Sequence, residues 1–281
     1  MRKYAGNNRV NADSVCKRNN VRVLGRPDGP ALVLVQGFGC DQVIWDRILP
    51  EFTDTYKVVL LDHVGTGGAE PSAYDAGKYA SLTGYVDDLL EVLDALELEN
   101  ATVLGHSVAG MMALAASLES HRITRLVLLC ASACYLNHDG YAGGFEPENV
   151  DEVLRAIESN YPLWAAAMAP GITGSEAGTE LSAELAGRMC RLRPEYVRDF
   201  LRMSFAADVR PLVLRVSVPT LVLQSRADPL TPEFASRYLH ELLTGGTLVK
   251  LAAQGHMPHL NAPRQTARVI RSFLETNSFE D

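Results

Sequence analysis

The feature that most constrains the fold of this chain is a series of short apolar segments that do not alternate with polar residues. They cover residues 31–35, 58–61, 103–104, 126–129, 220–223 and 248–252, and segments with apolar residues at three- and four-residue steps separate several of them. Such a pattern indicates parallel strands covered by helices on both faces. Residues 21–24 alternate instead and predict an edge strand. We therefore expect an α/β fold with a mostly parallel, doubly wound sheet, whose ligands bind beyond the carboxyl ends of the strands.

One long segment, residues 133–214, interrupts this alternation and contains only helical patterning broken by glycine and proline. We interpret it as a helical cap inserted between two strands. The chain then divides into a flexible extension (1–14), a core (15–132 and 215–281) and the cap (133–214). A cap above the strand ends must expose some side chains to a pocket. The expected pocket residues are His106, Tyr135, Phe145, Tyr161, Trp164, Met168, Phe205 and Met257.

Composition and charge exclude several classes of protein. The net charge of −8 disfavours nucleic acid as a general partner. The apolar runs are strand-sized, so no segment is predicted to span a membrane, and the absence of an apolar secretory segment favours a cytoplasmic protein. The five cysteines form no disulfide framework or zinc pattern, and the glycines at 65, 67 and 68 lack the spacing of a dinucleotide-binding loop. No metal or cofactor is expected.

The sequence Gly105-His106-Ser107-Val108-Ala109 connects a predicted strand to a predicted helix. A serine on such a sharp turn holds its hydroxyl above the sheet, at the N-terminus of the helix. The pentapeptide alone is common in Ala- and Gly-rich chains, whereas its position between strand and helix favours a nucleophile over a turn serine. We therefore predict that Ser107 is a nucleophile.

A serine nucleophile requires a base, and the base requires an orienting carboxylate, which in this fold follow in the order Ser, acid, His. Asp228 follows the strand at 220–223, whereas Asp139, Asp199 and Asp208 lie in a loop or in cap helices. His256 follows the last strand directly after a glycine, and His259 is the alternative base. We predict a triad of Ser107, Asp228 and His256.

Acyl transfer also requires donors for the oxyanion. The backbone N–H of Val108 is the first expected donor, and the N–H of Phe38 is the second. Phe38 lies between Gly37 and Gly39, directly after a long apolar strand, and the glycines permit a turn that directs the amide inward.

With these residues the chain resembles the α/β-hydrolases, and more narrowly the RsbQ-type bacterial stress-response regulators, which are related to the plant karrikin and strigolactone receptors. The resemblance rests on five stretches that extend over nearly the whole chain: Gly37-Phe38-Gly39-Cys40-Asp41-Gln42, Gly105-His106-Ser107-Val108, Cys134-Tyr135-Leu136-Asn137, Gly143-Gly144-Phe145-Glu146 and Gly255-His256-Met257-Pro258-His259. It implies a closed hydrophobic pocket beneath a four-helix cap and a small apolar ester or lactone ligand. Two positions depart from the family pattern: Ala109 replaces the usual elbow glycine, and Gln36 replaces a histidine or proline.

Two hypotheses of function follow. In the first, the protein is a serine esterase or lactonase that forms an acyl-enzyme on Ser107. In the second, which the resemblance implies, it is a ligand-sensing module that works with a PAS-domain phosphatase in sigma-factor stress regulation and hydrolyses slowly. Dehalogenases and epoxide hydrolases carry aspartate at the elbow and are disfavoured, whereas a cofactor-free haloperoxidase would share the triad. No nucleic-acid or membrane partner is expected.

Overall fold

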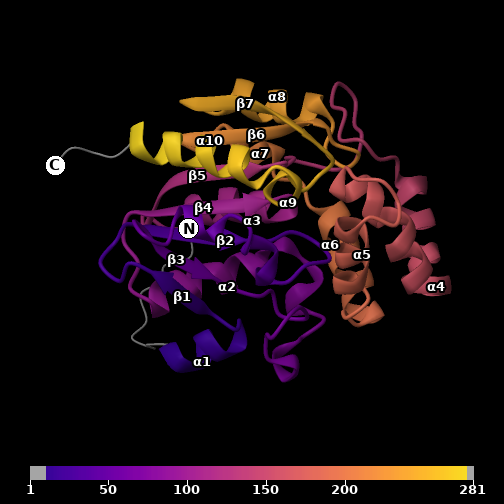
Figure 1. Ribbon diagram of the computed structural model, residues 1–281, viewed down its shortest axis with the longest axis horizontal. Helices are drawn as coiled ribbons and strands as arrows, with labels where there is room; N and C mark the ends of the chain where they lie inside the picture. The colour runs from indigo at the N-terminus through magenta and orange to yellow at the C-terminus, as the bar shows by residue number, and fades with distance from the viewer. Residues whose placement is uncertain (1–10, 277–281) are drawn as a thin grey trace.

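The computed structural model describes residues 11–276 (Figure 1). Within these residues a seven-stranded sheet has the order β1-β3-β2-β4-β5-β6-β7. The strands are β1 (Arg22–Gly25), β2 (Ala31–Val35), β3 (Lys57–Leu60), β4 (Ala101–His106), β5 (Ile123–Leu129), β6 (Thr220–Ala227) and β7 (Gly246–Gln254). All neighbours pair in parallel except β1 and β3. The predicted parallel sheet with one alternating edge strand is confirmed.

Residue burial explains why these segments form a central sheet. Every residue of β2 and β4 is buried, because helices cover both faces of the sheet at its centre. The core helices are α1 (Ala12–Arg18), α2 (Leu82–Ala95), α3 (Val108–Ser117), α8 (Glu233–Leu242), α9 (Pro258–Asn261) and α10 (Pro263–Thr276). The segments between β2 and α2 also contain short 3-10 helices. These are η1 (Gln42–Trp45), η2 (Leu49–Glu51), η3 (Pro71–Ala73) and η4 (Lys78–Ala80).

The predicted helical insertion is also confirmed, and its three longest helices project from one end of the sheet (Figure 1). It contains α4 (Pro147–Thr173), α5 (Glu180–Met189), α6 (Pro194–Ala206) and α7 (Arg210–Val213). Helix α4 is kinked at Asn160, which has non-helical angles (φ −158°, ψ 84°) two residues before Pro162. Proline lacks an N–H and clashes with the preceding turn, which accounts for the kink.

The two backbone segments that connect the insertion to the core lie side by side. Cys134 and Asp208 form an antiparallel bridge, and the N–H of Val209 donates to the carbonyl of Ala133 at 2.8 Å. The cap is therefore joined to the core by two backbone segments that are hydrogen-bonded to each other.

At the N-terminus, most of the expected extension lies outside the described residues. Its last residues, Ala12–Ser14, form the first turn of α1, which Asn11 caps through a hydrogen bond to the N–H of Asp13. No helix of residues 11–276 is both long and apolar enough to cross a bilayer.

Candidate active site

Ser107 lies at the turn between β4 and α3 and has a positive φ (φ 58°, ψ −129°). A non-glycine residue in this region is strained by roughly 1–3 kcal/mol and persists only where the surrounding structure imposes it. Here β4 and α3 are both buried and impose the turn. The turn places Ser107 at the end of β4, where it lines a cavity.

Glycines permit the close contacts of this turn. A Cβ at Gly105 would lie 2.3 Å from the carbonyl oxygen of Ala109, and one at Gly110 would lie 2.5 Å from the Cβ of Ala131. Ala109 itself is fully buried in α3. The close contacts therefore require glycine at positions 105 and 110, and the turn accepts the methyl group of Ala109.

Asp228 and His256 are hydrogen-bonded to each other. Nδ1 of His256 lies 2.8 Å from one carboxylate oxygen of Asp228 and 3.0 Å from the other. The backbone N–H groups of Leu230 and Thr231 donate to the same carboxylate, at 2.9 and 3.0 Å. Both side chains are almost completely buried. The carboxylate is thus held in place and fixes the orientation of the imidazole ring, with Nε2 on the far side.

The other candidate carboxylates and the alternative base lie elsewhere. Asp199 accepts a hydrogen bond from Tyr74, and Asp208 is paired with Arg210. The ring of His259 packs against Trp45 at 4.7 Å between centroids, and burial lowers the pKa of His259 to about 3. His259 is therefore a neutral core residue at neutral pH.

The hydroxyl of Ser107 contacts Tyr135. The two hydroxyl oxygens are 3.0 Å apart, and burial raises the pKa of Tyr135 above its usual value. Nε2 of His256 is buried and makes no hydrogen bond with the described residues. Nevertheless, Ser107 and His256 line the same small cavity. Tyr135 rather than His256 therefore holds the serine hydroxyl in this structure.

Two residues beside Ser107 have backbone N–H groups without a hydrogen-bond partner in the described part of the chain. Phe38 and Val108 both line the cavity beside Ser107, and neither N–H donates to another group of residues 11–276. A Cβ at Gly37 would lie 2.8 Å from the Cβ of Ser107, so the loop before Phe38 passes directly against the serine. The nearby Gln36 is buried, and its carbonyl accepts a hydrogen bond from His63 at 2.7 Å.

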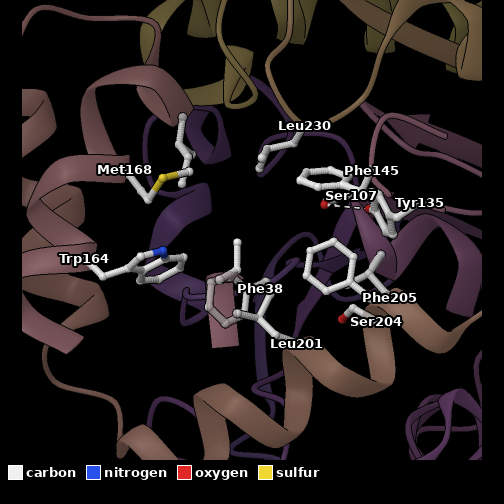
Figure 2. Close-up of a pocket in the computed structure, with 13 residues that line it drawn as sticks. Phe38, Ser107, Tyr135, Phe145, Trp164, Met168, Leu201, Ser204, Phe205 and Leu230 are labelled. Atoms are coloured by element: carbon white, nitrogen blue, oxygen red, sulfur yellow. Dashed lines mark hydrogen bonds between the residues drawn. The ribbon is translucent and has the colours of Figure 1, made fainter. Parts of the chain in front are cut away.

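Figure 2 shows the larger of two cavities around Ser107, with a volume of about 70 Å³. Five predicted pocket residues line it, namely Tyr135, Phe145, Trp164, Met168 and Phe205. Sequence reasoning missed five other lining residues as pocket residues: Val153, Ile172, Leu201, Ser204 and Leu230. Their aliphatic or small side chains give no signal that separates a pocket wall from helix packing.

Three predicted pocket residues lie elsewhere. His106 and Met257 line the smaller cavity, which has a volume of about 20 Å³. Tyr161 lines neither, because its hydroxyl donates to the carbonyl of Met189 at 2.7 Å and its ring stacks on Trp164. In this structure the Tyr161 side chain thus packs between α4 and α5, and its place in the pocket stays a prediction.

The larger cavity is almost wholly apolar. The hydroxyl of Ser204 is satisfied by the carbonyl of Phe200 in its own helix, at 2.8 Å. The polar side-chain atoms that remain at the cavity belong to the hydrogen-bonded pair Ser107 and Tyr135. Such a cavity suits an apolar ligand with one carbonyl group directed at Ser107.

Two groups of side chains in the described part of the chain bring metal-ligating atoms within 4.8 Å of one another. The first combines Cys130 with Asp228 and His256, which already bond each other. The second combines Cys134, His138 and Asp208 near the base of the cap, where Arg210 occupies both oxygens of Asp208. In both groups the carboxylate already has a partner.

The sheet order, the inserted cap and the strand–serine–helix turn define the class of protein. The chain belongs to the alpha/beta hydrolase family, whose sequence profile matches residues 32–269.

Particular relatives are similar along nearly the whole chain. A strigolactone esterase from Arabidopsis thaliana is 38% identical over 257 residues, which cover 91% of this chain and 96% of the relative. A karrikin insensitive 2 receptor from Petunia hybrida is 36% identical, covering 87% and 91%. Among solved structures, a hydrolase from Oleispira antarctica matches with a TM-score of 0.91 and 33% identity, covering 95% of this chain and 98% of that one. The protein is thus closely related to the plant karrikin and strigolactone receptors.

Proposed function

We propose that the protein is a serine hydrolase that cleaves a small hydrophobic ester or lactone, with Ser107 as nucleophile, His256 as base and Asp228 as the orienting acid. One observation carries the proposal: Ser107 and the Asp228-bound His256 line one enclosed cavity, which adjoins a larger apolar cavity. The strigolactone esterase from Arabidopsis thaliana supports the same reaction class by its name.

In the proposed reaction, Ser107 Oγ attacks the ester carbonyl while its proton passes to Nε2 of His256. The carbonyl oxygen becomes an oxyanion and accepts hydrogen bonds from the N–H groups of Phe38 and Val108. The bond to the alcohol oxygen then breaks, and His256 returns the proton to that oxygen. In the second half, water loses a proton to His256 and attacks the acyl-enzyme, and Ser107 recovers its hydroxyl.

Asp228 has a separate role in this scheme. Its carboxylate accepts from Nδ1–H of His256, which leaves Nε2 free to receive the proton of Ser107. The two backbone N–H donors at Leu230 and Thr231 keep this carboxylate from rotating away. Asp228 therefore fixes the tautomer of His256 and stabilises its positive charge during the reaction.

The test is steady-state hydrolysis of nitrophenyl esters from acetyl to octanoyl, measured beside Ser107→Ala. We expect turnover that is lost in the variant, with an optimum at a short acyl chain because the larger cavity has a volume of only about 70 Å³. Cys190→Ser, at an exposed position outside the site, serves as the matched control. Turnover that Ser107→Ala leaves unchanged would refute the proposal.

A second candidate function is ligand sensing, with slow or incidental hydrolysis. The observation that favours it is that the Ser107 hydroxyl is hydrogen-bonded to Tyr135, while Nε2 of His256 has no hydrogen-bond partner among the described residues. Ligand sensing is also supported by the karrikin insensitive 2 receptors among the relatives. The resemblance to RsbQ-type regulators, which work with a PAS-domain phosphatase, supports it as well. Ser107-dependent turnover hundreds of times below the enzyme median of about 10 per second would favour sensing.

A further inference from the structure

Three side chains that can bind a metal ion meet where the cap joins the core. They are Cys134 and His138, in the segment that leads into the cap helices, and Asp208, in the segment that leads out of them. One ligand atom of each lies within 4.8 Å of the ligand atoms of the other two. No sequence motif marks this cluster, and no metal was expected, because Asp208 is far from the other two in the chain and approaches them through the antiparallel bridge to Cys134.

The backbone holds the three residues in place. Cys134 and Asp208 pair across the bridge, and the hydroxyl of Tyr141 donates to the carbonyl of Cys134 at 3.0 Å. His138 and Tyr141 exchange two backbone hydrogen bonds of 2.9 Å across a tight turn, in which Gly140 has a positive φ of 74°. Because their backbone is already fixed, these residues lose little conformational freedom when they bind an ion.

The distance between the sulfur and the imidazole nitrogen fits zinc. Sγ of Cys134 lies 3.5 Å from Nε2 of His138. Zinc binds thiolate sulfur at about 2.3 Å and imidazole nitrogen at about 2.0–2.1 Å, so two such ligands at a tetrahedral angle are about 3.5–3.6 Å apart. Thiolate, imidazole and carboxylate together favour Zn²⁺ over Mg²⁺ or Ca²⁺, which prefer oxygen ligands alone. Three protein ligands leave the fourth tetrahedral position to water.

Arg210 is the charged neighbour that opposes a cation at this place. Its side chain donates to both oxygens of Asp208, at 2.9 and 2.6 Å, and its backbone N–H donates to Oδ1 at 3.0 Å. An ionised carboxylate has about four acceptor positions, so one position on Oδ2 remains for a metal ion. Once Cys134 is a thiolate, its charge and that of Asp208 together outweigh the charge of Arg210. His138 and Asp208 are exposed, so an ion can enter from solvent.

We propose that Cys134, His138 and Asp208 form a Zn²⁺ site that fastens the entry and exit segments of the cap to each other. The inference does not depend on the proposed function, because none of the three residues lines the cavities around Ser107. When the ion binds, the S–H bond of Cys134 breaks, an S–Zn bond forms and the proton passes to solvent. The neutral imidazole of His138 binds through Nε2, and Asp208 binds through Oδ2.

Metal titrations of the full chain, first freed of metal with a chelator, test the site. Co²⁺ bound to a thiolate gives a charge-transfer absorption band in the near ultraviolet. We expect one equivalent of Co²⁺ to produce this band and one equivalent of Zn²⁺ to abolish it, because Zn²⁺ binds such ligands more tightly than Co²⁺. Zn²⁺ should also raise the midpoint of thermal unfolding, since an ion that binds the folded state stabilises it. A missing band and an unchanged midpoint would overturn the proposal.

Variants assign the ion to the three residues. Cys134→Ser should abolish the Co²⁺ band. His138→Ala should weaken Zn²⁺ binding more than about 100-fold, because the loss of even an outer-shell partner of a ligand costs about 10- to 100-fold. Asp208→Asn should weaken it more than about tenfold. Because His138 is exposed, His138→Ala should keep the fold, so it tests the site even if Cys134→Ser fails to fold.

Two further cysteine variants show whether the ion binds elsewhere. Cys190→Ser removes an exposed cysteine outside the cluster and should leave the titration unchanged. Cys130→Ser alters the other group of metal-ligating side chains, which includes Asp228 and His256, and should also leave it unchanged. A band that is lost in either of these variants but kept in Cys134→Ser would place the ion at another site and overturn the proposal. Zn²⁺ binding that His138→Ala leaves unaltered would overturn it as well.

Discussion

Nε2 of His106 donates a 2.8 Å hydrogen bond to the backbone carbonyl of His256, and so joins the residue before the candidate nucleophile to the candidate base. The N–H of His256 donates in turn to the carbonyl of Ile172, at 2.7 Å, near the end of cap helix α4. The backbone of the candidate base is therefore held by the core on one side and by the cap on the other. This arrangement explains how a loop residue keeps a fixed position relative to Ser107.

Replacement of His106 by alanine should loosen the position of His256. The carbonyl of His256 would lose its partner in a buried site, which costs about 1–3 kcal/mol. We expect kcat of ester hydrolysis to fall roughly tenfold or more with a smaller change in KM, and the urea midpoint to fall as well. His121→Ala, at an exposed site, is the control. A kcat equal to that of the unmodified protein would contradict this role.

Gly37→Ala should disable the site without unfolding the protein. The new Cβ would lie 2.8 Å from the Cβ of Ser107 and 3.2 Å from Nδ1 of His106, so the serine or the Phe38 loop must shift. A displacement of about 1 Å at a reacting group costs on the order of 100-fold in rate. In Gly171→Ala the added methyl group meets no atom within 4 Å, and this variant should keep full activity. The comparison is made by nitrophenyl ester turnover, with circular dichroism to verify the fold.

Ala109→Gly tests the departure from the usual elbow. Because Ala109 is buried within α3 without the close contacts of Gly105, glycine there removes a methyl group and adds backbone freedom. We expect a loss of about 1 kcal/mol in unfolding free energy and no gain in turnover. Urea denaturation and ester hydrolysis measure the two effects. A several-fold rise in activity would instead indicate that the methyl group restrains the turn.

The stability of the protein should fall as pH decreases from 7 to 5, in part through His259. Burial lowers the pKa of His259 from 6.5 to about 3, so in this range the unfolded chain binds a proton that the folded protein does not. For one such histidine, the free energy of unfolding is then about 2 kcal/mol lower at pH 5 than at pH 7. His106 and His63, whose pKa values are also lowered by burial, act in the same direction.

His259→Gln should remove that part of the pH dependence. We expect the difference in unfolding free energy between pH 7 and pH 5 to be about 2 kcal/mol smaller in the variant than in the unmodified protein. Urea titrations at the two pH values measure this difference, and His121→Gln, at an exposed position, should leave it unchanged. An unaltered pH dependence in His259→Gln would show that His259 does not remain neutral in the folded state.

Much of the fold was predictable from local pattern. Residues 31–35 and 126–129 are unbroken apolar runs, and a run of this kind buried on both faces becomes an inner strand. The helical insertion was likewise visible as a long segment without strand patterning. The kink of α4 at Asn160 was not predictable in its direction, although Pro162 was present in the sequence, because a proline breaks a helix without specifying the new direction.

The sequence by itself determined which residues stand at the strand ends, because strand and helix periodicity and turn glycines are properties of neighbouring residues. On this basis Ser107, Asp228 and His256 were placed at the same edge of the sheet. Only the tertiary structure decided that Ser107 bonds Tyr135, that His106 bonds His256, and that the space around Ser107 is divided into two cavities. These features depend on distances between segments far apart in the chain, which only the packing of the whole fold sets.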